Sequence, residues 1–295
     1  MKHLPYDLTP EELTRFTSSW TGERDSAGRP YVADSVLDTL ARYVSIPFAW
    51  EMLKNEGYVR QTLHGYSSTC PDQVMVGRAA TAVYLPLRPD IRELLMEAGH
   101  ADGEMGDMVS WPIERLQPRD VYVADVFGKV EYGAIIGERL SSAIFARTGN
   151  GVVHYASVRD IDGIRSIQGF NAFYKGVHPS HASPQTVNLM GVNCPIRMEG
   201  VCVMPGDVVL AKEDCILFIP PQFAEMLALR GAVVHYMDAF AIQRMREGRY
   251  RPGAIDAEWT QDMIEDFHAW TAQQDDVPFT RAQVDELLAS KIRIW

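Results

Sequence analysis

The stretch that decides the fold runs from Gly137 to Asp160 and reads GERLSSAIFARTGNGVVHYASVRD. Residues 137–148 have the composition of a helix, and the run that begins at residue 151 is rich in Val and Tyr, as strands are. A helix that leads into a strand is a building unit of α/β folds, in which helix starts and strand ends meet at the edge that binds ligands. The adjacent charges Arg159 and Asp160 at the end of an apolar strand therefore need an explanation.

The residues on either side extend this α/β pattern from about 71 to 232. Short runs rich in Val, Ile, Tyr and Phe alternate with helical segments. Their short spacing favours a mixed sheet over a purely parallel, doubly wound one. The predicted strands are residues 76–85, 120–126, 151–156, 201–203, 207–211 and 215–220, and the predicted helices are residues 90–100, 137–148 and 221–230.

Helices are also predicted at both ends of the chain. Residues 1–70 form a helical N-terminal extension, in which Thr9 caps a helix and Glu12 reaches back to it. Residues 233–295 form a helical C-terminal extension with a second capping box at residues 280–283. These extensions either cover the core or clasp a neighbouring subunit, and the sequence leaves both options open.

The charge balance excludes some classes of partner. The 295 residues carry a formal net charge of −11 with a pI near 5.2. Nucleic acids and anionic membranes attract basic surfaces, so neither is an expected partner. No apolar run reaches the roughly 18 residues of a membrane span and no secretory segment opens the chain, so a cytoplasmic location is expected. The four cysteines lack CxxC spacing and are expected to be reduced and mostly buried.

Three residues of the 137–160 stretch suit the binding of an oxo acid. Gly137 opens the predicted helix, whose first amides lack intrahelical acceptors and attract a carboxylate or phosphate. The planar guanidinium of Arg159 suits a substrate carboxylate or a forming enolate oxygen. Asp160 offers hard oxygens to Mg²⁺, which typically takes only one or two protein carboxylates. Such an ion chelates a 2-oxo acid and stabilises its enolate.

The alternative is an ordinary ion pair between Arg159 and Asp160. Arg-Asp dipeptides are frequent in surface turns, and the chain has two more, Arg24-Asp25 and Arg119-Asp120. Both stand in polar stretches and are interpreted as solvated. The dipeptide alone favours this alternative, so a functional role needs support from the surrounding sequence.

That support is a resemblance. Four segments stand in the order found in the RraA-like family, which contains the ribonuclease E activity regulator A and the 4-hydroxy-4-methyl-2-oxoglutarate aldolases. They are GRAATAVYL (77–85), GERL (137–140), VRDID (158–162) and PGDVVLAKEDCILFIP (205–220). The gap from Gly137 to Arg159 also matches the family spacing. The resemblance spans residues 77 to 225, about half of the chain.

The resemblance implies a fold and a site. The fold is α/β, with a swivelling β/β/α core between the helical N- and C-terminal extensions, assembled as a homotrimer or homohexamer with active sites between subunits. In the aldolase branch, the residue matching Arg159 holds the pyruvate portion and the residue matching Asp160 holds Mg²⁺ or Mn²⁺. The backbone amides that match Glu138, Arg139 and Leu140 bind the substrate carboxylate.

The chain departs from the family pattern in several places. Tyr155-Ala156 stands where the family often has Asp-Gly, and Tyr155 is expected to fill core beside the strand. Lys212 and Cys215 replace the usual Asp and Gly of the closing motif. In the aldolases an acidic residue of the neighbouring subunit assists the metal waters. Three residues are options for that role, which are Glu199, Glu213 and Asp214.

Histidines downstream of the signature are further site options. His178 and His181 lie in KGVHPSHASP, where the family has a loop near the pocket. They either contact substrate and carry protons, or make only local hydrogen bonds. Glu138 is expected to assist Arg159 in catalysis by hydrogen bonding to metal waters. His154 is expected to be a core residue whose hydrogen bonds are satisfied.

The leading hypothesis is a divalent-metal-dependent carbon–carbon lyase, a class II-type pyruvate aldolase. It cleaves a 4-hydroxy-2-oxo acid to pyruvate through a metal-bound enolate, with oxaloacetate decarboxylation as a side activity. A variant is a hydratase or hydrolase of a related oxo or sugar acid. An alternative of another class is a non-catalytic RraA-type regulator that binds a ribonuclease or helicase. A methyltransferase is disfavoured, because no Gly-rich nucleotide loop follows a strand.

Overall fold

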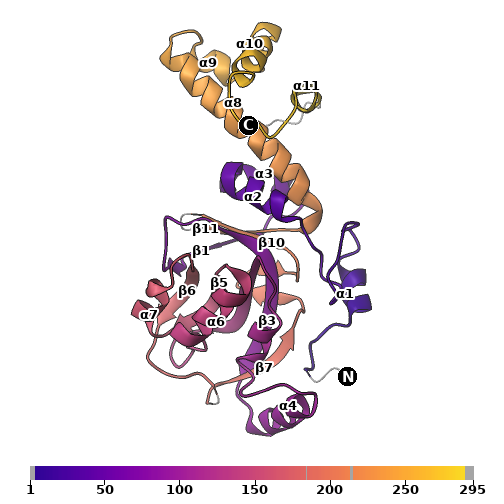
Figure 1. Ribbon diagram of the computed structural model, residues 1–295, viewed down its shortest axis with the longest axis vertical. Coiled ribbons are helices and arrows are strands. Elements are labelled where there is room, and N and C mark those ends of the chain that lie inside the picture. The colour runs from indigo at the N-terminus through magenta and orange to yellow at the C-terminus, as the bar shows by residue number, and fades with distance from the viewer. Residues whose placement is uncertain (1–3, 184, 213–214, 290–295) are drawn as a thin grey trace.

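A mixed β-sheet forms the centre of the molecule (Figure 1). The computed structural model describes residues 4–183, 185–212 and 215–289. The strands are β1 (Thr62–His64), β2 (Ser67–Ser68), β3 (Met75–Pro86), β4 (Asp120–Lys129), β5 (Val152–Val158), β6 (Ala172–Val177), β7 (Val187–Val192), β8 (Ile196–Met198), β9 (Val201–Val203), β10 (Val208–Lys212) and β11 (Cys215–Ile219).

The helices lie on the faces and at the ends of this sheet. They are α1 (Pro10–Phe16), α2 (Asp34–Tyr43), α3 (Ile46–Asn55), α4 (Pro89–Ala101), α5 (Trp111–Glu114), α6 (Glu138–Thr148), α7 (Ile161–Ser166), α8 (Ala224–Arg246), α9 (Pro252–Ile255), α10 (Gln261–Thr271) and α11 (Arg281–Ala289), with a 3₁₀ turn at Pro221–Phe223. Figure 1 shows α6 and α7 beside the strands, and α2 and α3 between β10 and α8.

The sheet order is β1-β11-β10-β3-β4-β5-β6-β2, and β7 pairs with β3 outside this path. The four central strands β3, β4, β5 and β6 run parallel to one another. The flanking pairs are antiparallel, as are β8 and β9, which form a separate ribbon. The mixed sheet predicted from the sequence is therefore confirmed, and the parallel centre places the ends of β4, β5 and β6 at one edge.

Local sequence explains several element boundaries. The Thr9 hydroxyl accepts a hydrogen bond from the Glu12 amide at 3.2 Å, and the Glu12 carboxylate accepts one from the Thr9 amide at 2.8 Å. Residues 280–283 make the second predicted capping box. Gly149 ends α6 at φ +63°, a left-handed conformation that glycine adopts without a Cβ clash.

Three buried clusters hold the elements together. The largest lies on both faces of β3 to β6. The second joins α2, α3 and the first part of α8 to β10 and β11, through residues such as Leu40, Leu217 and Leu227. The third joins the far part of α8 to α10 and α11 around Phe240 and Phe267. Figure 1 shows these last helices projecting from the sheet as an arm.

The structure corrects part of the predicted element list. Five strands, β1, β2, β6, β7 and β8, were not predicted, because each is short or follows Gly- and Pro-containing stretches without alternation. The helix predicted at residues 221–230 continues without a break to Arg246 as α8. The divisions at residues 70 and 232 stay predictions, although β1 and β2 belong to the main sheet and α8 crosses residue 232.

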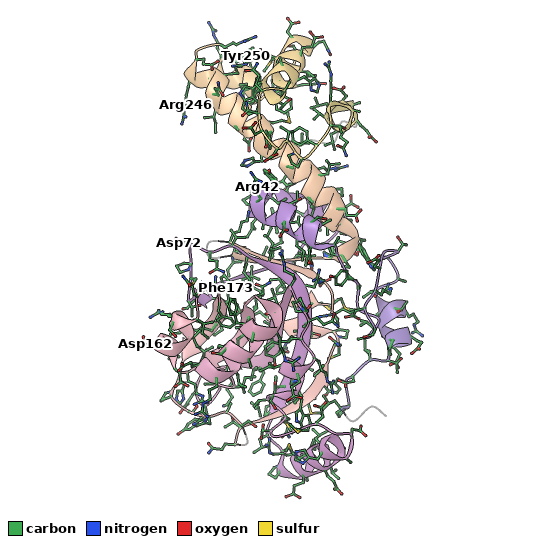
Figure 2. All side chains as sticks on the ribbon, in the orientation of Figure 1. Arg42, Asp72, Asp162, Phe173, Arg246 and Tyr250 are labelled. Atoms are coloured by element: carbon green, nitrogen blue, oxygen red, sulfur yellow. The ribbon has the colours of Figure 1, made fainter. Side chains whose placement is uncertain are left out.

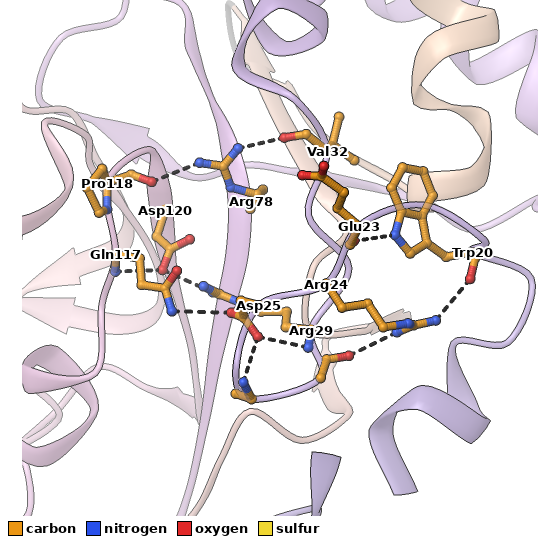
Figure 3. A network of polar contacts seen from close by, with 12 residues as sticks. Trp20, Glu23, Arg24, Asp25, Arg29, Val32, Arg78, Gln117, Pro118 and Asp120 are labelled. Atoms are coloured by element: carbon orange, nitrogen blue, oxygen red, sulfur yellow. Dashed lines mark hydrogen bonds and ion pairs between the residues drawn. The ribbon is translucent and has the colours of Figure 1, made fainter. Parts of the chain in front are cut away.

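The two other Arg-Asp dipeptides are not solvated as predicted. Asp120 is fully buried, and its carboxylate lies 3.0 Å from the Arg29 guanidinium (Figure 3). The same guanidinium contacts Asp25 at 2.9 Å, whose side chain is only 7% exposed. Burial raises the pKa of Asp120, and the Arg29 charge opposes that shift. A polar stretch at residues 21–30 thus folds against the start of β4 because Arg29 supplies a buried cation.

Two smaller expectations were also wrong. The cysteines are free among the described residues, but only Cys194 is buried. His154 lies in the core as predicted, at 0% exposure, yet neither of its ring nitrogens has a hydrogen-bond partner among the described groups. Burial lowers the pKa of His154 to about 4, so the ring is neutral.

Candidate active site

Backbone hydrogen bonds join the end of β5 to the residues that precede α6. The Arg159 amide donates to the Ile136 carbonyl at 3.0 Å, and Ile136 pairs with Val158 as a parallel bridge. Gly137 follows Ile136 directly, so the first turn of α6 is fixed beside the end of β5. The structure therefore brings Gly137 together with Arg159 and Asp160, which follow it by 22 and 23 residues in the sequence.

Asp160 turns back toward Gly137. Its backbone has φ 55° and ψ 45°, a left-handed conformation that is unusual for a residue other than glycine. A Cβ atom built at Gly137 would lie 2.7 Å from Asp160 Oδ2 and 3.0 Å from Arg159 Cγ. Only glycine fits at this position without moving the two charged side chains. Backbone strain at a non-glycine residue frequently accompanies functional sites.

The Arg159 guanidinium is only partly satisfied within the chain. Its Nη1 lies 3.5 Å from Asp160 Oδ2 and 3.4 Å from His181 Nε2. Its Nε is buried and has no hydrogen-bond partner among the described groups. The Arg159 side chain is 27% exposed and that of Asp160 is 50% exposed, so the contact is a loose, half-open pair rather than a closed one. The pair can therefore open toward a ligand.

The first turn of α6 adds backbone donors to this place. Gly137 is the N-cap and contributes no side-chain cap, and its carbonyl accepts from Ser141 as the first helical bond. The amides of Glu138, Arg139 and Leu140 consequently have no acceptor within the helix. The dipole of α6 adds positive potential at the same end. These features suit a carboxylate next to Arg159.

Glu138 leans from α6 across the start of α7. A Cβ atom built at Gly163 would lie 2.5 Å from Glu138 Oε2, so the small residue at Gly163 leaves room for the carboxylate. Gly163 lies in the first turn of α7, and Asp160 immediately precedes that helix. The Glu138 carboxylate therefore lies beside the turn of α7 that follows Asp160. The Arg139 side chain is exposed, and Leu140 packs against the main core. Within this segment only Glu138 offers an acidic side chain to the site.

The two histidines of the downstream loop differ in their contacts. The His178 amide donates to the Val158 carbonyl at 3.0 Å, but its ring bonds to Ser180 at 2.8 Å and lies 5.1 Å from the Tyr132 ring. Among the described residues, the His178 ring thus makes only local contacts with its own loop and with Tyr132, as in the alternative in which it has no role in substrate binding. His181 instead lies against the guanidinium. Tyr132 and Ser180 belong to no sequence motif, so the sequence alone gives no signal for them.

The acidic residues that the sequence offers as metal-water partners are not placed at Asp160. Glu199 pairs with Lys175 at 2.5 Å, in the turn between β8 and β9. Glu213 and Asp214 lie outside the described residues. Tyr155 is partly buried and packs against the main core, as predicted. These positions do not identify which acidic residue of a neighbouring subunit would assist Asp160.

The donor set near Asp160 fits a hydrated hard cation. Within residues 4–289, gaps excepted, no group of three or more His, Cys, Asp or Glu side chains converges as a full protein cage would. Mg²⁺ does not require such a cage, because it commonly keeps several waters and takes one or two carboxylates. The half-exposed Asp160, held in a fixed turn with Glu138 nearby, meets that requirement. Tetrahedral zinc, with its three or four protein ligands, does not fit these residues.

The sheet, the α6 turn and the Arg-Asp signature together define the class. The chain belongs to the RraA-like family, whose model, described as Aldolase/RraA, matches residues 33–218. The chain is 27% identical over 146 residues to Protein DlpA of Legionella pneumophila (strain Philadelphia 1), a match that covers 50% of this chain and 21% of DlpA. The chain thus spans about a fifth of that curated relative.

Solved structures share the fold. RraAS2 of Streptomyces coelicolor, described as an unusual member of the RNase ES inhibitor RraA protein family, is 23% identical with a TM-score of 0.58. The match covers 75% of this chain and all of RraAS2. An uncharacterized protein from Pseudomonas syringae pv. tomato DC3000 is 21% identical with a TM-score of 0.59, covering 74% and 96% of the two chains. At these identities the likeness concerns the fold alone, and it confirms the α/β core.

The family contains both lyases and non-catalytic regulators. Membership in the family therefore does not decide which of these two activities the chain has. The helical C-terminal extension predicted from the sequence is present as α8 to α11. None of the helices that the structure describes combines the length and the apolar composition needed to cross a bilayer.

Proposed function

We propose that the chain is a divalent-metal-dependent lyase that cleaves a 4-hydroxy-2-oxo acid to pyruvate and a second carbonyl compound. Oxaloacetate, which loses CO₂ through the same enolate, would be an additional substrate. The observation that carries the proposal is the buried Arg159 Nε, which has no hydrogen-bond partner in the described part of the chain, beside the α6 amides that lack intrahelical acceptors. Buried donors without acceptors are rare and costly, so an anionic ligand is the natural partner for this position.

Each residue has a role that follows from its chemistry. Arg159 and the amides of the first α6 turn would bind the substrate carboxylate and the oxygen on C2. Asp160 would hold Mg²⁺ or Mn²⁺ together with waters, and Glu138 would accept hydrogen bonds from those waters. When bound, the cation would polarise the 2-oxo group.

The reaction conserves its protons and electrons within the substrate and the chain. The 4-hydroxyl gives up its proton, the C3–C4 bond breaks, and the electron pair of that bond forms the pyruvate enolate. A proton then adds to C3. His181 Nε2, next to the Arg159 guanidinium, is the group best placed to hold the 4-hydroxyl proton between these steps. His178 would contribute through the loop that it orders, rather than through its ring.

Assembly would complete the site. As a homotrimer or homohexamer, the chain would cover the half-exposed Asp160 with a neighbouring subunit, which would also supply the missing acidic residue. Exclusion of water strengthens the interactions of Arg159 with developing charge.

The test measures pyruvate release in an assay coupled to lactate dehydrogenase, in which the oxidation of NADH reports the pyruvate formed. Protein stripped with EDTA is assayed on oxaloacetate and on 4-hydroxy-2-oxo acids, with and without added Mg²⁺ or Mn²⁺, against protein-free blanks. We expect metal-dependent release that falls about 100-fold or more in Asp160→Asn. The matched control is Asp162→Asn, since Asp162 is an exposed carboxylate two residues further on α7 (Figure 2). Its activity should stay within about twofold of wild type.

Two results would reject the lyase. One is a wild-type protein that releases no pyruvate with either metal from any of these acids. The other is equal activity of Asp160→Asn and wild type. The first result, with the oligomer intact, would favour a non-catalytic regulator that binds a ribonuclease or helicase. The second would show that any pyruvate release does not depend on the Asp160 carboxylate.

A further inference from the structure

A second concave site lies where the sheet edge meets the helices. This cleft has a volume of about 700 Å³ and lies between the end of α2, the start of α3, the middle of α8, and strands β1, β10 and β11. It shares no residue with the Gly137–Asp160 site. Its size is within the range of pockets that enclose small organic ligands. No step of the proposed lyase reaction uses it.

The described lining of this cleft is cationic, whereas the chain as a whole is acidic. Four side chains that carry or can carry positive charge line it, and its described lining includes no carboxylate. They are Arg42, His64, Lys212 and His235. The chain as a whole has a formal net charge of −11. Such a local concentration of cations in an acidic protein favours an anionic ligand over a cationic or neutral one.

Arg42 and Lys212 are held in different ways on the two sides of the cleft. Arg42 is exposed at the end of α2 and lies 5.1 Å from the Tyr43 ring, and its ion-pair partners include no described carboxylate. Lys212 Nζ donates to the Val44 carbonyl at 2.7 Å, which fixes the ammonium group at the wall formed by the α2–α3 connection. Arg42 and Lys212 thus contribute cationic groups to the lining of one cleft.

The start of α3 adds backbone polarity to this wall. Ser45 is the N-cap and its hydroxyl accepts from the Phe48 amide at 3.4 Å. Ser45, Ile46 and Pro47 all line the cleft, so the positive end of the α3 dipole faces it. This end of α3 reinforces the side-chain cations and does not stand alone as a site.

The remaining lining includes aromatic and aliphatic side chains. Tyr43 and Trp50 contribute rings, and the His235 imidazole lies 5.3 Å from the Tyr43 ring in an edge-on contact. Ile46 and Pro47 supply aliphatic surface between them. Rings of this kind favour a planar body by stacking and by exclusion of water. An inorganic anion would leave this surface unused.

We infer that the cleft binds a small aromatic carboxylate, with the carboxylate between Arg42 and Lys212 and the ring against Tyr43 and Trp50. The inference stands independently of the lyase. A ligand at this place contacts both the sheet edge and α8, which leads to the projecting arm.

The test uses 2-naphthoate and its neutral analogue 2-naphthamide, titrated calorimetrically into the full chain. We expect saturable binding of 2-naphthoate and binding of 2-naphthamide that is at least about tenfold weaker, because only the acid uses the cations. Arg42→Gln should weaken 2-naphthoate at least about tenfold. The matched control is Arg246→Gln, because Arg246 is an exposed arginine at the far end of α8 (Figure 2). It should bind as wild type does.

Arg159→Gln separates this site from the proposed active site, where a carboxylate would also bind. Unchanged 2-naphthoate affinity in that variant supports the cleft, and loss of binding there overturns it. Equal binding of acid and amide, equal binding by Arg42→Gln and wild type, or no binding by wild type would also overturn the inference. Sedimentation velocity provides a further measurement, the oligomeric state of each variant. A change of oligomeric state in Arg42→Gln with unchanged affinity would identify the cleft as a subunit contact and would refute ligand binding.

Discussion

Replacement of Gly137 by alanine tests the proposed active site with the smallest change available. The backbone there, at φ −139° and ψ −167°, is extended and accepts any residue. The added Cβ would lie 2.7 Å from Asp160 Oδ2, whereas ordinary contact begins at 3.4 Å, so the carboxylate must move by about 0.7 Å. Arg159, at 3.0 Å from the same Cβ through its Cγ, must also adjust. The change thus displaces the two charged groups without removing either.

The expected effect on activity is much larger than that on stability. A misplacement of about 1 Å in a catalytic group costs on the order of 100-fold, so kcat/KM for pyruvate release should fall between about 10- and 100-fold. Alanine caps a helix less well than glycine by a fraction of a kcal/mol, but it also lowers the entropy of the unfolded chain by about 0.4–1 kcal/mol. These contributions nearly cancel, and the free energy of unfolding should change by less than about 1 kcal/mol.

The assay pairs pyruvate release with Mn²⁺ binding, measured from the electron paramagnetic resonance signal of the free ion. Gly253→Ala is the matched control, because its added Cβ meets no atom within 4 Å. We expect Gly137→Ala to weaken Mn²⁺ binding and catalysis together, with an unchanged urea midpoint. Wild-type activity and wild-type Mn²⁺ affinity in Gly137→Ala would refute the assignment of Asp160 and Arg159 to the site.

Three further predictions concern stability. Arg29→Met leaves the buried Asp120 carboxylate without its cation and should lower the free energy of unfolding in urea by about 3–5 kcal/mol. Arg88→Met, the control, breaks only the exposed pair with Asp90 and should change that free energy by less than about 0.5 kcal/mol. Similar losses of stability in the two variants would contradict this prediction. Burial raises the pKa of Asp207 to about 7 from 3.8, so its contribution to stability is complete below about pH 4 and is lost as pH rises through 7. Asp207→Asn should remove about 4 kcal/mol of that decline between pH 4 and 7, and an unchanged pH profile would disprove it. Phe240→Ala removes a ring whose centroid lies 5.4 Å from the ring centroids of Trp259 and Phe267. We expect the free energy of unfolding, measured by thermal denaturation, to fall by about 3–5 kcal/mol. A loss of less than about 1 kcal/mol would show that the arm is loosely packed.

The parts of the fold that local pattern controls were predictable. Strands β3, β4 and β5 have continuous runs of β-branched and aromatic residues, and α6 is bounded by Gly137 and Gly149. From these, the adjacency of Gly137 to Arg159-Asp160 followed, because an α/β unit brings a helix start and a strand end to the same edge. The left-handed backbone of Asp160 was not visible, since it depends on how α7 turns away from β5.

The parts that depend on distant partners were not predictable. Asp120 looked solvated because its neighbours are polar, but the residue that permits its burial, Arg29, lies 91 positions away. Strands β1 and β2 are too short to show alternation and exist because β11 and β6 offer open edges. The cleft around Arg42 draws its lining from separate elements, so no sequence motif marks it.

Helix α8 belongs to two buried clusters at once. Its residues Ala224, Leu227 and Ala228 pack under the sheet-covering helices, and Val233, Met237 and Phe240 pack within the arm. The 23 residues form a rod of about 35 Å. At Gly231 the rod passes so close to Val44 that an added Cβ would lie 2.4 Å from Val44 Cγ2. Because α8 is one continuous helix that takes part in both clusters, a displacement of the distal helices is transmitted by side-chain packing to β10 and β11.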